Sequence, residues 1–319
     1  MPSAFSANPW PSIASAETTS APVTLYLLRY NVTLVDPVGY KFAYVLSDIC
    51  RAIASGIRSL GYRCDLTTNN IDAGAINIMV GTHLLSAQDL GLVQQSGSQY
   101  IALHTEWLSP GDPPYKVKST FQGNNFEPTQ RAFLEGALAV WEAWDSNIQL
   151  LSRFDIPAER FRRFWVGYHE DLEEIRHRPY ADKDIDALFV GSITPRRQTI
   201  LQGLAQSMFV QGVFDSPHPF RNDFIARSKI NLALFSDPAL NYFSFLRIGY
   251  ALNNHAFVVS EPSINDRGMQ DLIVTVEAER MAERCTELIQ SGDIPRLAEE
   301  GYERYRQLPM TDVVKELLG

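Results

Sequence analysis

The sequence is poor in the residues that build disulfide frameworks and metal clusters. It has 3 cysteines and 6 histidines in 319 residues. Cys50, Cys64 and Cys285 are scattered and odd in number, which fits neither a disulfide framework nor the spacing of zinc ligands. We therefore expect them to be small buried side chains in a reducing compartment, the cytoplasm, with a Cys50–Cys64 encounter left open. We expect no metal site.

Long apolar runs and targeting signals are also lacking. No segment approaches the ~18 apolar residues that a membrane-spanning helix needs. The first twenty residues are rich in Ser, Ala, Thr and Pro, and they show neither the charged start nor the apolar stretch of a secretory signal. We expect residues 1–20 to form a disordered arm, with Trp10 available to anchor it.

Positive charge is in the minority. The chain has 28 Lys and Arg against 37 Asp and Glu, a formal net charge of −9. An acidic surface argues against non-specific binding to nucleic acid or to anionic membranes, which basic patches carry out. It still permits a local basic pocket for a phosphorylated ligand.

Three common fingerprints of chemistry are absent. The sequence contains no Walker phosphate loop, no G-x-G-x-x-G and no G-x-S-x-G. These absences argue against a P-loop NTPase, an NAD enzyme and an α/β-hydrolase.

What the sequence does have is length for two domains and an alternation of strands with helices. A single core stops growing at about 250–300 residues. In the first half we expect a polar loop at 29–39 and an amphipathic helix at 44–60. The expected strands there are 23–28, 63–66, 76–80, 100–103, 164–166 and 140–144, the last being alternatively the end of a helix from about 129.

The pattern restarts after a charged stretch at 170–183. The expected strands of the second half are 185–190, 209–214, 230–235, 256–260 and 272–276. The expected helices are 196–206, 220–228, 243–253, 277–290, 294–307 and 311–318. This alternation predicts an α/β protein with two Rossmann-like domains facing across a cleft, at 21–170 and 185–319, joined by a linker at 171–184.

Three segments of the second half carry a family resemblance. They are DALFVGSITPRR at 186–197, DFIARSKINLAL at 223–234 and LRIGYALNNHAFVVSE at 246–261. Together they resemble bacterial-type group 1-like glycosyltransferases of the GT-B architecture, and in particular the branch of spore-maturation CgeB-like proteins. The stretch from Trp144 to Tyr168 fits the same branch, so the similarity covers about residues 140–307.

The resemblance implies a metal-independent transferase with the acceptor on the first domain and a nucleotide-sugar donor on the second. It also implies that the last helix packs back on the first domain. One departure is visible. Many retaining members have two glutamates, eight residues apart, where this chain has Tyr242 and Tyr250, or Asn241 and Gly249 if the alignment shifts by one residue.

Two segments of the second half are candidates for binding the donor phosphates. In Gly191–Arg197, a strand ends at glycine, and Thr194 and Pro195 suit a helix start, whose free N–H groups attract anions. In Asn241–Arg247, an arginine lies one turn into a helix. The candidate donor-binding residues are Gly191, Ser192, Arg196, Arg197, His218, Tyr242, Phe243, Ser244 and Arg247.

The first half supplies the candidates for proton transfer. His104 and Glu106 follow a strand and are expected at the carboxyl edge of the sheet, where either side chain is suited to act as general base or to bind the acceptor. Asp145, after Trp144, is a third candidate.

The sequence thus predicts a glycosyltransferase (EC 2.4) that uses a UDP-, GDP-, TDP- or CMP-sugar. The acceptor is a glycan, a protein, a small molecule or a modified nucleobase. Two alternatives stay open: another GT-B-shaped enzyme, such as an epimerase or sugar phosphorylase, and a catalytically silent nucleotide- or sugar-binding module.

Overall fold

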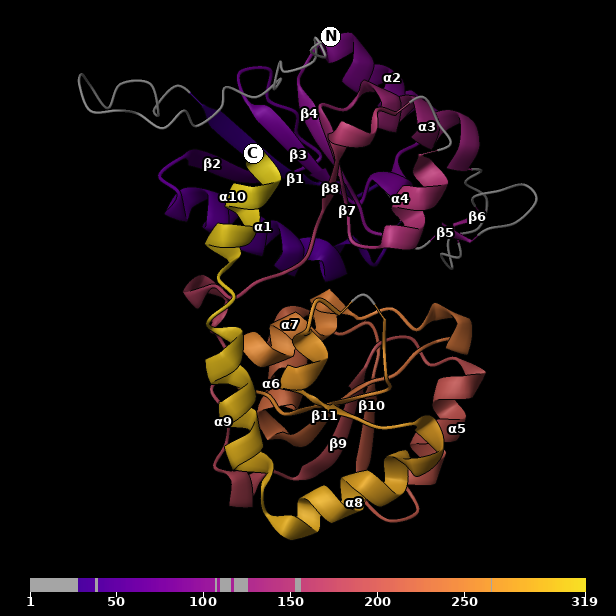
Figure 1. Cartoon of the computed structure of the whole chain (residues 1–319), viewed down its shortest axis with the longest axis vertical. Helices are drawn as coiled ribbons and strands as arrows, with labels where there is room; N and C mark the ends of the chain where they lie inside the picture. Colours follow the sequence, from indigo (N-terminus) through magenta and orange to yellow (C-terminus); the bar gives the residue numbers. More distant parts are fainter. Residues whose placement is uncertain are drawn as a thin grey trace, which may run out of the picture. The chain divides into compact units, whose positions relative to one another are not determined.

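The structure, a computed structural model, describes residues 28–37, 40–106, 108–109, 116–117, 126–152, 156–264 and 266–319. The chain divides into two compact units (Figure 1). Unit 1 takes Met1–Trp165 and Thr311–Gly319, and unit 2 takes Val166–Met310, including the expected linker. The expected arm at 1–20 lies outside the described residues, as does all of the expected strand 23–28 except Leu28.

Unit 1 is built on a six-stranded sheet in the order β2-β1-β3-β4-β7-β8. All of its neighbouring strands run parallel. The strands are β1 (Arg29–Leu34), β2 (Arg63–Thr68), β3 (Ile76–Val80), β4 (Tyr100–His104), β7 (Ala139–Glu142) and β8 (Phe161–Arg163). The short strands β5 (Leu108–Ser109) and β6 (Lys116–Val117) form a separate antiparallel pair.

The first strand corrects the sequence prediction. Residues 29–34 were expected in a polar loop, but they form β1 in the interior of the sheet. The polar side chain of Asn31 is fully buried, where it donates to Asn77 Oδ1 over 2.9 Å and receives the Thr67 hydroxyl at 2.8 Å. Polar residues are tolerated in a central strand when neighbouring strands satisfy their hydrogen bonds.

The last strand of unit 1 is a second correction. We expected a strand at 164–166, whereas β8 occupies Phe161–Arg163 and pairs with β7. An edge strand leaves one side open to solvent, so it accommodates the two arginines that a search for an apolar run passes over. The alternatives for 140–144 are also resolved, because α3 ends at Gly136 and β7 begins at Ala139.

Helices cover the sheet of unit 1. They are α1 (Ser47–Ser59), α2 (Ala87–Ser96), α3 (Phe126–Gly136), α4 (Asp145–Leu151) and α10 (Met310–Leu318). In α1 the buried side chains of Ile49, Ile53 and Ile57 recur every four residues, so one face of the helix packs inward against β1 and β2. The final helix, α10, is assigned to unit 1 from Thr311 onwards.

Unit 2 repeats the same topology with five parallel strands in the order β10-β9-β11-β12-β13. The strands are β9 (Ile185–Val190), β10 (Val210–Val213), β11 (Ser228–Ala233), β12 (Val258–Ser260) and β13 (Val274–Thr275). The helices are α5 (Pro195–Leu204), α6 (His218–Arg227), α7 (Phe245–Asn253), α8 (Met281–Ser291) and α9 (Ile294–Tyr305). Every expected strand and helix of this half has a counterpart, and the predicted α/β class with two Rossmann-like units is confirmed.

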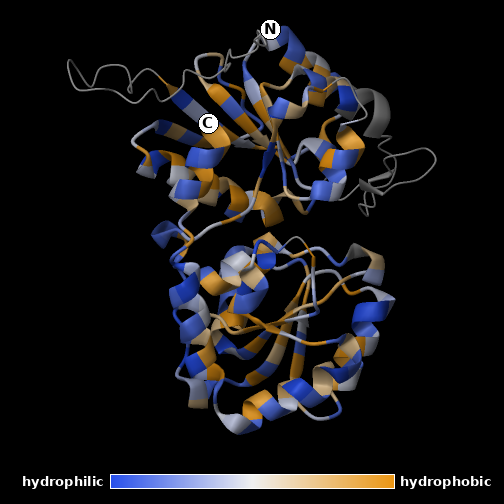
Figure 2. Ribbon diagram, viewed as in Figure 1, coloured by the Kyte–Doolittle hydropathy of each residue, from blue (hydrophilic) through white to orange (hydrophobic). Residues whose placement is uncertain are grey.

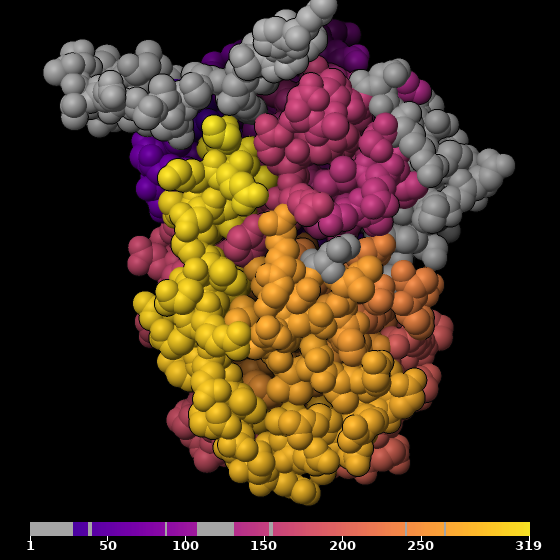
Figure 3. Space-filling view, in the orientation of Figure 1, coloured from indigo at the N-terminus to yellow at the C-terminus, as the bar shows by residue number. Residues whose placement is uncertain are grey.

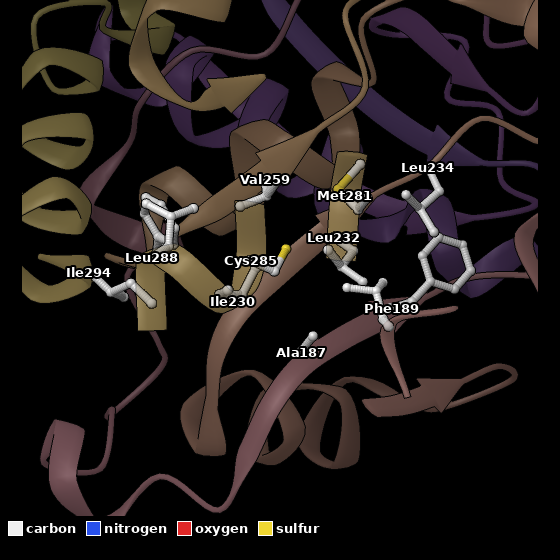
Figure 4. Packing of buried hydrophobic residues seen from close by; sticks show 12 residues of the cluster. Ala187, Phe189, Ile230, Leu232, Leu234, Val259, Met281, Cys285, Leu288 and Ile294 are labelled. Atoms are coloured by element: carbon white, nitrogen blue, oxygen red, sulfur yellow. The ribbon is translucent and has the colours of Figure 1, made fainter. Parts of the chain in front are cut away.

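The core of unit 2 lies between its sheet and α8. Met281, Cys285 and Leu288 recur at helical spacing and belong to one buried cluster with strand side chains: Met281 lies near Leu232, Cys285 near Ile230, and Leu288 beside Ile294 (Figure 4). Colouring by hydropathy shows the same division, with apolar strands inside and mixed or polar helix surfaces outside (Figure 2). Burial of all three cysteines agrees with the expectation, and it raises the pKa of each thiol.

Two close approaches fix α9 against the rest of unit 2. A Cβ at Gly249 of α7 would lie 2.9 Å from the Tyr305 hydroxyl, and one at Gly301 would lie 2.6 Å from the carbonyl oxygen of Leu272. Glycine is therefore needed at both crossings. The space-filling view shows α8 and α9 along the surface of this unit (Figure 3). Among the described residues no helix has the length and apolarity to cross a membrane.

Candidate functional site

The strand order of unit 2 reverses at one point, which makes the carboxyl ends of its strands a candidate ligand site. The chain leaves β9 toward β10 on one side, and β11 follows on the other side. In open parallel sheets such a reversal leaves a crevice at the carboxyl ends of the strands, where ligands bind. The residues that follow β9 and β11 are Gly191–Ser192 and Leu234–Phe235. Three arginines gather there.

Arg247 is the arginine of this edge whose charge has the least internal compensation. Its Nε donates to the Val190 carbonyl over 3.0 Å, and its guanidinium lies 5.3 Å from the centre of the Phe189 ring. Among the described residues no carboxylate pairs with it. Burial, and then the positive charge of Arg197, lower the pKa of Arg247 to about 9. A charge that is desolvated beside a like charge favours an anionic ligand.

Arg196 and Arg197 have structural duties that the sequence did not reveal. Arg197 donates through Nε and Nη2 to the Leu234 carbonyl, at 3.0 and 2.8 Å, and through Nη1 to Ser192. Arg196 pairs with the buried carboxylate of Glu261. Arg197 thus ties together the ends of β9 and β11, and it contributes its charge to the site more than its hydrogen bonds.

Gly191 is required by this arrangement. Its φ of +149° lies in a region that side-chain-bearing residues rarely adopt, and a Cβ there would lie 2.9 Å from Arg247 Nη2. The following helix begins as the sequence predicts: Thr194 is the N-cap, its hydroxyl accepts from the Arg197 N–H at 3.4 Å, and Pro195 is the first helical residue.

The other predicted donor residues fall in different surroundings. His218 is the first residue of α6, and Ser244 is the N-cap residue of α7 without a capping bond from its side chain. Phe243 is buried, with its ring centre 5.1 Å from that of Phe245, so it serves the core. Tyr242 forms an isolated bridge with Ile264 and is partly exposed.

Tyr250, at the second of the two positions where many retaining members of the resembled family have glutamate, is hydrogen-bonded. The Tyr250 hydroxyl lies 2.6 Å from Glu174 Oε1 and 2.9 Å from Asn222 Oδ1. A carboxylate therefore reaches the C-terminal part of α7 from residue 174, far away in the sequence. Only the tertiary structure shows this.

In unit 1 two of the three expected proton-transfer residues, His104 and Glu106, belong to a polar cluster at the carboxyl end of β4. His104 is fully buried, and its Nδ1 lies 2.7 Å from Glu142 Oε2. Glu142 Oε1 accepts the N–H of Trp144 at 3.1 Å. The amide of Asn147 donates to the Glu106 carbonyl over 2.7 Å. His104 was expected at the edge facing a ligand, but its side chain is fully buried, and it acts on Glu106 through its charge.

Glu106 itself keeps 28% of its side chain exposed, and its Oε1 lies 3.3 Å from His83 Nε2. Burial raises its pKa to about 7, against the opposing effect of His104. A carboxyl group with a pKa near the working pH is suited to exchange protons. Burial, and then His104, lower the pKa of His83 to about 3, so its ring is neutral near pH 7.

Asp145 lies apart from this chemistry. It is the first residue of α4, and its Oδ1 pairs with Arg163 Nε at 2.9 Å on an exposed surface. Sequence reasoning missed His83, Glu142 and Asn147. His83 and Glu142 follow or end strands, so the rule that selected His104 also applies to them.

Among the described residues no group of three or more His, Cys, Asp or Glu side chains is placed to hold a metal ion. The arrangement offers two sites: an arginine-lined edge in unit 2 that suits an anion, and a carboxyl with a raised pKa in unit 1 that suits proton transfer.

Comparison with known proteins identifies the fold. No protein-family model and no curated protein matches the chain. Anabaena Alr3699/HepE in complex with UDP-glucose aligns at a TM-score of 0.58 and 11% identity, over 90% of this chain and 99% of that one. T4 phage BGT in complex with UDP and Mn²⁺ aligns at 0.57 and 11%, over 91% and 99%. At such identities the likeness shows the fold alone, and that fold is the α/β GT-B fold with two parallel sheets.

Proposed function

We propose that this protein is a glycosyltransferase that uses a nucleoside diphosphate sugar, with UDP-glucose as the first donor to test. The observation that carries the proposal is Arg247, a desolvated guanidinium beside Arg197 and Gly191 at the strand-order reversal of unit 2. Two oxyanions of a diphosphate would compensate both charges. The neighbours of similar fold were solved with UDP or UDP-glucose, which guides the choice of ligand.

In the proposed reaction Glu106 acts as the general base. It takes the proton of an acceptor hydroxyl, whose oxygen forms a bond to the anomeric carbon of the sugar. The bond from that carbon to the diphosphate oxygen breaks, and the electron pair leaves with the nucleoside diphosphate. Arg247 stabilises the negative charge that develops on the leaving group.

Finer assignments belong to the same proposal. The segments 186–197, 223–234 and 246–261 support the CgeB-like branch. A cytoplasmic location is proposed on the cysteine usage, and metal independence on the family resemblance. Ser192, Tyr242, Ser244 and His218 are proposed to contact the donor, and the acceptor class stays unassigned. Phe243 and Asp145 are better explained by packing and by a surface ion pair.

The test is calorimetric titration of the full-length protein with UDP and UDP-glucose, with and without EDTA. Arg247→Ala should weaken UDP binding about 10- to 100-fold, because a hydrogen bond to a charged group contributes about 1.5–3 kcal/mol. The matched control is Arg296→Ala, an exposed arginine of α9 that pairs with Glu300 and Asp293 and should bind as the wild type does. Equal UDP affinity in Arg247→Ala, or no binding by the wild type, contradicts the proposed donor site.

The alternative of a silent binding module is separated by turnover. Release of UDP from UDP-glucose, with water as the acceptor, should be detectable in the wild type and lost in Glu106→Gln. A protein that binds UDP tightly but releases none from UDP-glucose, with or without added Mn²⁺, supports the module instead.

A further inference from the structure

The carboxyl of Glu106 is the outer end of a line of three side chains. The Thr105 hydroxyl lies 3.3 Å from His83 Nδ1, and His83 Nε2 lies 3.3 Å from Glu106 Oε1. The side chain of His83 is only 4% exposed. His83 comes from a 3-10 turn after β3, η3 (Thr82–Leu84), and the other two residues follow β4, so the line joins two neighbouring strand ends.

A neutral imidazole has one N–H and one lone pair, on opposite nitrogens. When the Thr105 hydroxyl donates to Nδ1, the hydrogen of the ring must be on Nε2. That hydrogen then lies on the nitrogen that is 3.3 Å from Glu106 Oε1, where it is placed to act as a donor to the carboxylate. A hydrogen bond to the charged form of a carboxyl favours that form. His83 in this tautomer therefore opposes the rise in the pKa of Glu106 that burial causes.

Other groups surround Glu106 and act on its charge. Tyr40 faces it from the loop before α1, and burial and then the charge of Glu106 raise the pKa of that phenol. His104, paired with Glu142, is on the sheet side, and Asn147 holds the backbone carbonyl of Glu106 from α4. Among the described residues, His83 approaches the carboxyl itself, with its Nε2 3.3 Å from Glu106 Oε1.

We propose that His83 is a positioning residue, held in its Nε2–H tautomer by Thr105, which donates to Glu106 and keeps this carboxyl ionisable as a proton acceptor. The same logic of a third group that fixes a histidine tautomer operates in hydrolase triads. The catalytic meaning of this contact rests on the proposed function, but the contact itself is testable without any substrate.

The experiment is a pH titration of Glu106 in the full-length protein by ¹³C NMR, with glutamate labelled at its side-chain carboxyl carbon. Glu106→Gln identifies the resonance. In His83→Phe the carboxylate loses its donor within an apolar site, so the titration midpoint should rise by about one to two units. His83→Gln keeps an N–H at a similar reach and should titrate close to the wild type.

The outcomes are distinct. A midpoint in His83→Phe that equals the wild type, or lies below it, overturns the proposal, because His83 would then be neutral toward the carboxylate or favour the acid. Failure of His83→Gln to restore the midpoint also overturns it. His83→Leu replaces His83→Phe if the larger ring prevents folding, as judged by circular dichroism. Absent UDP binding with an intact His83 effect would reject the proposed function alone.

Discussion

At the scale of single residues, three arginines at one sheet edge have three different environments. Arg196 forms an ion pair with the buried Glu261, and Arg197 donates hydrogen bonds to the carbonyls of Leu234 and Ser192. Within the described part of the chain, Arg247 donates only through Nε, to the Val190 carbonyl. The sequence treats Arg196 and Arg197 as equal phosphate ligands. Their partners lie directly after strand ends. Arg196 forms an ion pair with Glu261, which follows β12, and Arg197 bonds to Leu234, which follows β11.

Gly191→Ala tests how tightly the backbone and Arg247 depend on each other. The substitution forces a side chain into a conformation with φ of +149° and displaces Arg247 Nη2, which a Cβ would approach to 2.9 Å. We expect a loss of about 1–3 kcal/mol in the free energy of unfolding, measured by urea denaturation, together with weaker UDP binding.

The control for that experiment is Gly203→Ala in α5, where a Cβ would meet nothing within 4 Å. Because alanine favours helices, this variant should be as stable as the wild type or more stable by about 0.5–1 kcal/mol. If both variants bind UDP equally well, Gly191 has no part in the anion site.

At the scale of elements, the end of α7 is hydrogen-bonded to residues 169–175, which precede β9 in unit 2. Asn253 exchanges two hydrogen bonds with the backbone of His169, at 2.9 and 3.0 Å. Asn254 Oδ1 accepts the N–H groups of Glu174 and Ile175. From the sequence we expected only that a helix ends at residue 253. The tertiary role of this asparagine pair is to satisfy the backbone of an irregular stretch, which has no strand partner to do so.

The same segment contains a histidine that should make unit 2 sensitive to acid. His177 Nε2 lies 2.6 Å from the Asn254 carbonyl oxygen, and its Nδ1 lies 2.9 Å from Lys183 Nζ, which also donates to Ser228. Burial, and then Lys183, lower the pKa of His177 to about 4, with His255 adding in the same direction. The native state therefore resists protonation of this ring.

The free energy of unfolding should consequently decrease as the pH decreases. Between the ordinary histidine pKa of about 6.5 and about 4, the unfolded chain binds a proton at residue 177 that the native state does not, so the stabilisation is complete above this range and is lost as the pH drops. In urea denaturation, the wild type should lose about 2 kcal/mol more than His177→Gln between about pH 7 and pH 5.

The control is His218→Asn, a partly exposed histidine at the start of α6 that is not among the groups acting on His177. His83 has a lowered pKa as well, so only the difference between His177→Gln and the wild type is diagnostic. Parallel stability curves for these two proteins would show that His177 titrates normally.

At the scale of the whole molecule, the five strands of unit 2 have the same order as the first five of the six strands in the sheet of unit 1. The two units differ in whether their residues are continuous in the sequence. Unit 2 is one continuous stretch of sequence, whereas unit 1 combines Met1–Trp165 with the distant segment Thr311–Gly319. In α10 the side chains of Val313, Val314 and Leu317 are almost fully buried. Unit 1 therefore contains a buried helix that is separated in the sequence from the rest of the unit by all of unit 2.

Deleting residues 311–319 should destabilise unit 1 selectively. Each large apolar side chain that loses its burial costs about 1.5–3 kcal/mol. Hydrogen exchange should accelerate in β1, β3 and β4 and change little in β9 and β11. As a control, Lys315→Ala alters α10 at an exposed position and should leave exchange unchanged. Acceleration confined to unit 2 would contradict this assignment of α10.

The sequence by itself determined the α/β class and nearly every element of unit 2, because buried parallel strands such as Ile185–Val190 are continuous apolar runs bounded by glycine or polar turns. It also predicts Glu106 and Gly191 as site residues, since parallel sheets place ligand residues directly after strands. It predicts Arg247 because an arginine one turn into a helix lies near the free N–H groups of the helix start. It failed at β1 and β8, where polar or charged side chains occupy strands.

Tertiary structure alone decided which candidates share a site and what state they are in. His83, Glu142 and Glu174 are far in sequence from the groups they touch, and local periodicity carries no information about such partners. Burial and neighbouring charge, both consequences of packing, raise the pKa of Glu106 and lower that of Arg247. The chain dictates the elements through local pattern, and the site arises where separate strand ends meet.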